Sequence, residues 1–110
     1  KKKKLKKIYK KLRKKKKFSY DEIANFCGVN KTTAWKWSKG EMMPKHEKIE
    51  QLAELFNVSI DYLTGKTEEK KINDDIYLKK ISRLMTKLNE NDKKILLSII
   101  ENVLKIKENN

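Results

Sequence analysis

The sequence predicts an all-α fold, with a compact N-terminal domain of five helices followed by a C-terminal helical hairpin. Apolar residues recur at intervals of three and four positions along most of the chain, which is the spacing of one face of an α-helix. Only three glycines and one proline occur among the 110 residues. No segment alternates between polar and apolar residues as a half-buried strand does. These observations together leave helices as the only regular structure that we expect.

The first predicted helix has one apolar face and a strongly basic remainder. Its apolar face consists of Leu5, Ile8, Tyr9 and Leu12. Thirteen of the first seventeen residues are Lys or Arg, whereas the other 16 basic residues of the chain nearly balance its 15 acidic ones. Such a lysine run is typical both of a solvated surface and of non-specific attraction to phosphate. The net charge of +14 therefore does not by itself establish a nucleic-acid function.

The second and third predicted helices are short and are joined by a turn of about three residues. Ser19 and Glu22 form a capping box, in which each side chain binds the backbone amide of the other residue. Gly28 permits the positive φ of a sharp helix end, and Asn30 caps a third helix over 31–39. In the third helix, a spacing of three lets Ala34 and Trp37 pack inward. This leaves the outward face to Lys31, Thr32, Trp35 and Lys36.

The fourth and fifth predicted helices complete the domain. Pro44 opens the fourth helix, and Ser59 caps a short fifth helix that ends before Gly65. We therefore assign residues 1–65 to the first domain. The polar and charged residues 66–73 are interpreted as a linker.

Two further helices, over about 74–88 and 92–107, are predicted to form an antiparallel hairpin within 74–110, because the loop between them is short. The second of them is apolar over more of its circumference than one partner helix covers. Self-association into a four-helix dimer interface buries this excess, and folding back onto the first domain is the alternative. The residues predicted at the dimer interface are Leu84, Leu88, Leu96, Ile99, Ile100, Val103 and Leu104.

From Ile8 to Gly65 the sequence resembles the lambda-repressor and Cro-like, or Xre-type, helix-turn-helix family. The resemblance depends on the order and spacing of many positions rather than on any one of them. These are Ile8, Leu12-Arg13, Ser19-Tyr20-x-Glu22-Ile23-Ala24, Gly28-Val29-Asn30, Trp37, Gly40, Pro44, Leu52-Ala53 and Val58-Ser59-Ile60-Asp61-Tyr62-Leu63-x-Gly65. Family members commonly pair the arginine that matches Arg13 with a glutamate, but here Ser38 stands at that place, so a hydrogen bond would have to replace the ion pair.

The resemblance implies a lambda-repressor-like domain that binds double-stranded operator DNA as a homodimer. Base-reading positions then fall on Lys31, Thr32 and Lys36. Lysine donates to guanine O6 or N7, and threonine offers a hydroxyl and a methyl group that suits thymine. Positions that contact the DNA backbone or support the reading helix fall on Ser19, Tyr20, Thr33, Trp35, Lys39 and Lys45. For Trp35 the interpretations are contact with a thymine methyl or sugar, or packing over a neighbouring side chain.

We therefore expect a cytoplasmic transcriptional regulator on the nucleoid of a bacterial host, and specifically a phage or mobile-element repressor that binds a palindromic operator. An antitoxin-like module, which neutralises a partner protein through the hairpin, is the alternative, and a protein antirepressor is a further possible partner. No enzyme is expected, because one histidine and one cysteine offer neither a catalytic pair nor metal-ligand spacing. No cofactor and no metal are expected. Membrane attachment by the lysine-rich helix is disfavoured because the domain core needs its apolar face.

Overall fold

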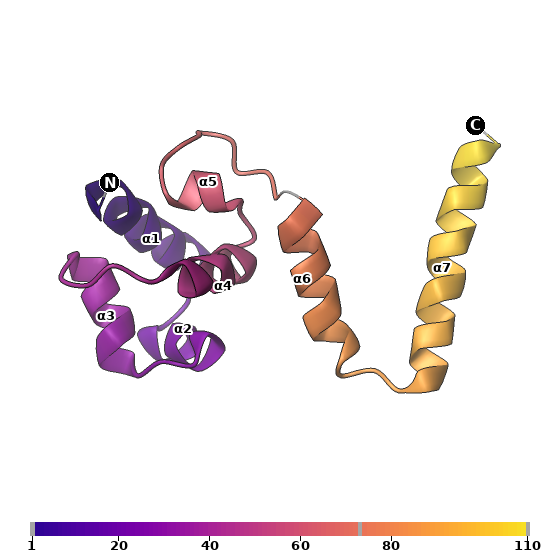
Figure 1. The fold of residues 1–110 in the computed structure, drawn as a ribbon, viewed down its shortest axis with the longest axis horizontal. Helices are drawn as coiled ribbons and strands as arrows, with labels where there is room; N and C mark the ends of the chain where they lie inside the picture. The colour runs from indigo at the N-terminus through magenta and orange to yellow at the C-terminus, as the bar shows by residue number, and fades with distance from the viewer. Residues whose placement is uncertain (1, 73, 110) are drawn as a thin grey trace. The chain divides into compact units, whose positions relative to one another are not determined.

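The computed structural model describes residues 2–72 and 74–109, and all regular structure in these ranges is α-helical (Figure 1). In chain order the helices are α1 (Lys2–Lys16), α2 (Tyr20–Cys27), α3 (Lys31–Lys39), α4 (His46–Phe56), α5 (Ile60–Leu63), α6 (Asp74–Met85) and α7 (Glu90–Glu108). The predicted all-α fold, with five N-terminal helices followed by a C-terminal pair, is confirmed. The chain divides into two compact units, Lys1–Tyr77 and Leu78–Asn110.

Two helices begin at other residues than the sequence indicated. α4 begins at His46, two residues after the buried Pro44. α7 begins at Glu90, within the segment predicted as a loop, because Asn89 acts as its N-cap. The Asn89 side chain accepts a hydrogen bond from the Asp92 amide at 2.8 Å, and the Asp92 carboxylate accepts one from the Asn89 amide at 3.2 Å. This reciprocal cap resembles the Ser/Glu capping box and adds half a turn to the helix.

The core of the first unit centres on aromatic side chains from α1, α3 and α4. The Tyr9 ring packs edge-on against Trp37, with ring centroids 6.2 Å apart, and against Phe56 at 6.0 Å. Phe18, in the connection after α1, adds a tilted contact with Phe56 at 5.9 Å. Edge-to-face pairs of this kind contribute about 0.5–1.5 kcal/mol each beyond the area that they bury. They fix α1 against both α3 and α4.

Tyr9 also ties α1 to α3 through a hydrogen bond. Its hydroxyl donates to the Ala34 carbonyl at 2.8 Å, and both residues are buried. Burial raises the pKa of the Tyr9 hydroxyl, so the group remains a protonated donor over the physiological range. The inner face of α3 is thus held by packing and by one polar contact with α1.

Cys27, the single cysteine of the chain, is fully buried at the end of α2. Burial raises the pKa of its thiol to about 11, so the thiol is protonated at neutral pH. The Lys48 ammonium donates to the Cys27 carbonyl at 2.7 Å and so satisfies a carbonyl group in the last turn of α2.

The chain after Gly65 packs against the preceding five helices. The Lys70 carbonyl accepts a hydrogen bond from the Ser59 amide at 3.2 Å, and Ile72 and Ile76 are both buried. The sequence places a linker at 66–73, but the compact unit continues to Tyr77 because these two isoleucines extend its core. Residue 73 lies outside the described residues.

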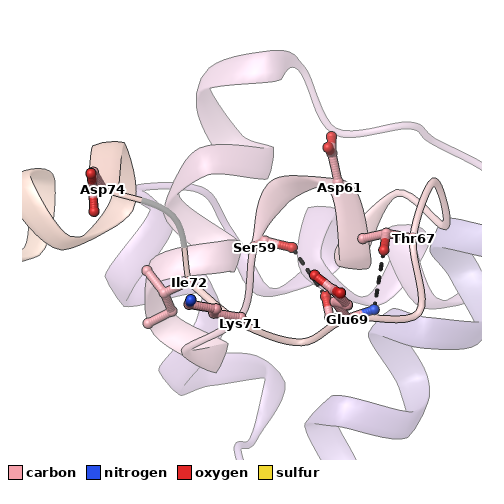
Figure 2. Close-up of a pocket in the computed structure, with 7 residues that line it drawn as sticks. All are labelled: Ser59, Asp61, Thr67, Glu69, Lys71, Ile72 and Asp74. Carbon is pink, nitrogen blue, oxygen red and sulfur yellow. Dashed lines mark hydrogen bonds between the residues drawn. The ribbon is translucent and has the colours of Figure 1, made fainter.

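Figure 2 shows the open pocket that this returning segment forms with α5. The Ser59 hydroxyl donates to the Glu69 carbonyl at 3.4 Å, and the Glu69 amide donates to the Thr67 hydroxyl at 3.2 Å (Figure 2). The other side chains that line the pocket belong to Asp61, Lys71, Ile72 and Asp74. The pocket therefore holds both acidic and basic groups, and the hydrogen bond from Ser59 to Glu69 joins the segment to the start of α5.

The second unit contains the end of α6 and all of α7. None of the described residues of α7 is buried, although the helix is rich in isoleucine and leucine. The exposed apolar side chains of α7 are Ile95, Leu97, Ile99, Ile100, Val103, Leu104 and Ile106, with 48–59% of each side chain accessible. In the single chain this surface faces solvent.

Candidate nucleic-acid interface

α2 and α3 form a helix-turn-helix unit whose ends are fixed by the predicted caps. The Ser19 hydroxyl accepts from the Glu22 amide at 3.0 Å, and the Glu22 carboxylate accepts from the Ser19 amide at 2.8 Å. Gly28 ends α2 with φ of +69°, in the left-handed region that glycine adopts readily. The Asn30 side chain then accepts from the Thr33 amide at 2.7 Å and begins α3. Local sequence signals thus determine both helix ends and the turn between them.

The two faces of α3 differ as the sequence predicts. Ala34 and Trp37 are buried on the inner face, and the neighbouring Ser38 is also buried. Lys31, Thr32 and Trp35 are exposed, whereas Thr33 and Lys36 are half-buried. The N-terminal half of α3 therefore presents donors and an indole ring to solvent, while its other face is fixed in the core.

Lys31 forms an ion pair with a residue of α2. Its ammonium lies 3.5 Å from the Asp21 carboxylate, in the first turn of α2, and both side chains are about two-thirds exposed. An exposed pair of this kind contributes about 0–1 kcal/mol and exchanges readily with solvent. Asp21 thus orients Lys31 without removing its capacity to donate elsewhere. The ten-residue separation along the chain left no local signal for this pair.

Arg13 does not form a hydrogen bond with Ser38 in place of the family's ion pair. Its guanidinium donates to the Phe18 carbonyl at 3.0 Å and lies over the Tyr20 ring, 4.3 Å from the ring centroid. The Ser38 hydroxyl instead donates to the Trp35 carbonyl at 2.5 Å, within α3. With serine in place of the family's glutamate, Arg13 braces the connection before α2 and the first residue of that helix.

The exposed ring of Trp35 is likewise accompanied by a cation. The Lys39 ammonium lies 5.3 Å from the ring centroid, one turn further along α3. Trp35, Tyr20, Lys31 and Thr32 line a shallow hollow of about 340 Å³ between the first turns of α2 and α3. Packing of Trp35 beside a neighbouring side chain is one of the two interpretations from the sequence, and the residue remains 41% exposed.

The remaining predicted contact residues lie at the edges of this surface. Ser19 is exposed, and because its oxygen accepts the capping bond, its hydroxyl proton is still available to donate. Lys39 and Lys45 are exposed at the end of α3 and at the N-cap of α4. Near the end of α3, the Lys6 side chain of α1 packs over Gly40; a Cβ atom on Gly40 would lie 2.9 Å from the Lys6 Cδ.

Two features of the described residues bear on other kinds of function. Among them, no group of three or more His, Cys, Asp or Glu side chains is placed to hold a metal ion. No described helix has the length and apolar character needed to cross a membrane. His46 is exposed and lies 3.6 Å from the Glu50 carboxylate, one turn along α4.

Comparisons with known proteins agree with this geometry. Residues 7–69 match the family described as "Helix-turn-helix domain". The chain is 36% identical over 84 residues to the cryptic phage CTXphi transcriptional repressor RstR of Vibrio cholerae, covering 76% of this chain and 73% of that protein. It is 38% identical over 55 residues to an uncharacterized HTH-type transcriptional regulator of Haemophilus influenzae. This alignment covers 49% of this chain but only 23% of that protein.

A solved structure supports the fold. The crystal structure of a transcriptional regulator from Listeria innocua aligns with a TM-score of 0.55 at 24% identity, and covers 93% of this chain and 94% of that one. Because the family match includes α2, the turn and α3, the capped unit described above is the family's defining motif in this chain. The chain therefore belongs to the lambda-repressor-like, Xre-type helix-turn-helix family of DNA-binding transcriptional regulators.

Proposed function

We propose that this regulator is a repressor of a phage or mobile element and that it binds a palindromic operator as a homodimer in the bacterial cytoplasm. The observation that carries the proposal is the division of α3 into a buried face, Ala34 and Trp37, and an outward face that begins with Lys31 and Thr32. A helix fixed in this way can enter the major groove without rearranging the core. The phage repressor among the relatives supports the assignment to a phage or mobile element.

The base-reading roles are assigned to Lys31, Thr32 and Lys36. Each lies in the first two turns of α3, where a recognition helix approaches the base edges most closely. Lysine donates to guanine O6 or N7, and threonine contacts either a base acceptor or a thymine methyl. Thr33 is half-buried and is assigned to a phosphate contact or to support of the helix.

Phosphate contacts are assigned to the residues around the rim of the unit. Ser19 and Tyr20 lie at the start of α2, where the amides of the first turn also attract anions. Lys39 and Lys45 lie on either side of the connection between α3 and α4. Such contacts set the register of the protein on the duplex and make affinity depend on salt.

Dimerisation is assigned to the second unit. At about 100° per residue, the apolar side chains of α7 between Ile95 and Ile106 span roughly 200° of its circumference, about twice the stripe of an ordinary surface helix. A second copy of the chain supplies a matching apolar surface by symmetry. The interface residues are Leu84, Leu88, Leu96, Ile99, Ile100, Val103 and Leu104, and all of them are exposed or half-buried in the single chain.

The same apolar surface favours a second candidate function, the binding of a different protein. In an antitoxin-like protein or a repressor controlled by an antirepressor, that partner occupies α7 in place of a second copy. The phage repressor relative favours the dimeric repressor, and the oligomeric state of the purified chain distinguishes the two. A chain that stays monomeric at micromolar concentration would favour the second candidate.

Selection of random duplex DNA by the purified protein tests the proposed function. We expect a two-fold symmetric motif that binds at least a thousandfold more tightly than random DNA, as specific binders do. Lys36→Ala and Lys31→Ala should each relax the preference at individual base pairs, with a loss of about 1–3 kcal/mol of discrimination. Lys66→Ala, at an exposed lysine three residues after the end of α5, removes the same charge and should leave every base preference unchanged.

If selection gives no motif, and affinity only falls with salt at a slope of about −0.9 per phosphate contacted, the proposed function is wrong. The lysine-rich α1 would then account for all DNA binding. A motif without two-fold symmetry would support sequence reading but contradict the dimer.

Asp21→Asn should strengthen binding to any duplex about two- to fivefold. The substitution removes a carboxylate that lies 3.5 Å from Lys31 and faces the phosphates of the proposed complex. Asn keeps the shape of the side chain, so the fold should be unaffected. Filter-binding or fluorescence-anisotropy titrations at two salt concentrations measure the effect.

Asp61→Asn, in the first turn of α5, changes the net charge equally and serves as the control for Asp21→Asn. It should alter affinity by less than the Asp21 substitution does. Equal effects of the two variants would mean that the gain reflects net charge alone and that Lys31 is not near the DNA.

A further inference from the structure

The hollow between α2 and α3 has two aromatic walls, each held in place by a cation. Tyr20 supplies one wall, and the Arg13 guanidinium lies over its ring at 4.3 Å. Trp35 supplies the other wall, with the Lys39 ammonium 5.3 Å from its ring centroid. Both rings are thus supported by groups outside the hollow. A cation–π contact of this kind favours one ring orientation before any ligand binds.

The lining of this hollow is almost wholly apolar, which is unusual on a surface that meets nucleic acid. Phosphate oxygens prefer polar partners, so an apolar hollow does not suit them. Among the base edges in the major groove, only thymine presents an apolar group, its C5-methyl. The remaining lining residues, Lys31 and Thr32, are those assigned to base reading.

We infer that the hollow formed by Tyr20, Thr32 and Trp35 binds the C5-methyl edge of a thymine in each operator half-site. This inference depends on the proposed operator binding and adds the base that the hollow selects. The hollow is larger than one methyl group, so it also accepts the C5–C6 edge of the pyrimidine ring. Lys31 at its rim is placed to donate to O4 of the same thymine or to a neighbouring guanine. Trp35 is therefore a specificity-determining residue.

The test replaces each thymine of the selected operator by uracil, which removes only the methyl group. Binding is measured for the wild-type protein, Trp35→Ala and Trp35→Phe. In the wild type, one thymine per half-site should lose about fourfold in affinity on replacement, since burial of one methyl is worth about 0.8 kcal/mol. Replacement in both half-sites should cost about fifteenfold. The other thymines of the operator serve as internal controls.

The variants connect this effect to the hollow. Trp35→Ala should bind the thymine and uracil duplexes equally well, whereas Trp35→Phe keeps an aromatic wall and should retain part of the preference. Circular dichroism of each variant checks that the helical fold is intact. The same position should also favour 5-methylcytosine over cytosine in the wild type.

The outcomes separate the two proposals. If a symmetric motif is selected but no uracil replacement has an effect that depends on Trp35, the thymine inference is wrong and the operator-binding proposal stands. The same conclusion follows if Trp35→Ala keeps the full methyl preference. If no motif is selected at all, both proposals fail.

Discussion

Replacement of Ile100 by glutamate is expected to lower operator affinity at least about a hundredfold without unfolding the helix-turn-helix unit. Ile100 lies on the apolar face of α7 and is 48% exposed in the single chain, so the substitution costs the monomer little. In the proposed dimer the new carboxylate is buried without a partner, which costs several kcal/mol. A monomer offers only one α3 to the duplex and loses the second half-site. Analytical ultracentrifugation and operator titration measure the two effects.

Ser98→Glu is the matched control for this prediction. It adds the same charge two residues away, about 200° around α7 from Ile100, in the middle of the polar face. We expect a normal dimer and affinity within a few-fold of the wild type. If the Ile100→Glu protein remains dimeric, the dimer interface does not include this face of α7. A monomer with full operator affinity would show that DNA reading does not require the dimer.

The helices of the first unit that could be predicted from the sequence are those whose ends and buried faces depend on residues close together in the chain. The capping box of Ser19 and Glu22, the cap at Asn30 and the left-handed Gly28 each act within four residues, so the sequence alone indicates them. The inward positions of α3 followed from helical spacing in the same way. A helix-turn-helix unit is recognisable from sequence because its ends and its buried face depend on such short-range rules.

What the sequence did not indicate depends on contacts between distant residues. Ile72 lies in a segment whose charge and polarity are typical of a linker, yet it is buried, and this follows only from where the chain returns after α5. The pairing of Lys31 with Asp21 and the position of Arg13 over Tyr20 likewise join different elements. Lys31 and Tyr20, which take part in these two contacts, both line the hollow on the α3 surface. No periodicity or motif in the sequence encodes it.

Trp37→Ala is expected to remove most of the stability of the first unit, and DNA binding with it. Trp37 is 3% exposed and packs edge-on against Tyr9, and truncation of such a residue typically costs about 3–5 kcal/mol. Among the described residues its indole nitrogen has no hydrogen-bond partner, so the loss arises from packing. The total free energy of unfolding of a domain of this size is roughly 5–15 kcal/mol. Thermal unfolding should therefore shift downward by on the order of 20 °C.

Trp35→Ala separates the two tryptophans of α3, because it makes the same chemical change two residues earlier on the exposed face. The substitution removes the side chain of a residue that is 41% exposed and one contact with Lys39. The thermal unfolding midpoint of the variant should therefore fall by only a few degrees. The unfolding midpoint of Trp37→Phe should lie between those of Trp35→Ala and Trp37→Ala, since this variant keeps an aromatic ring in the core and removes the unpaired indole N–H. Equal losses for Trp35→Ala and Trp37→Ala would contradict the division of α3 into a core face and a DNA-reading face, on which the proposed recognition depends.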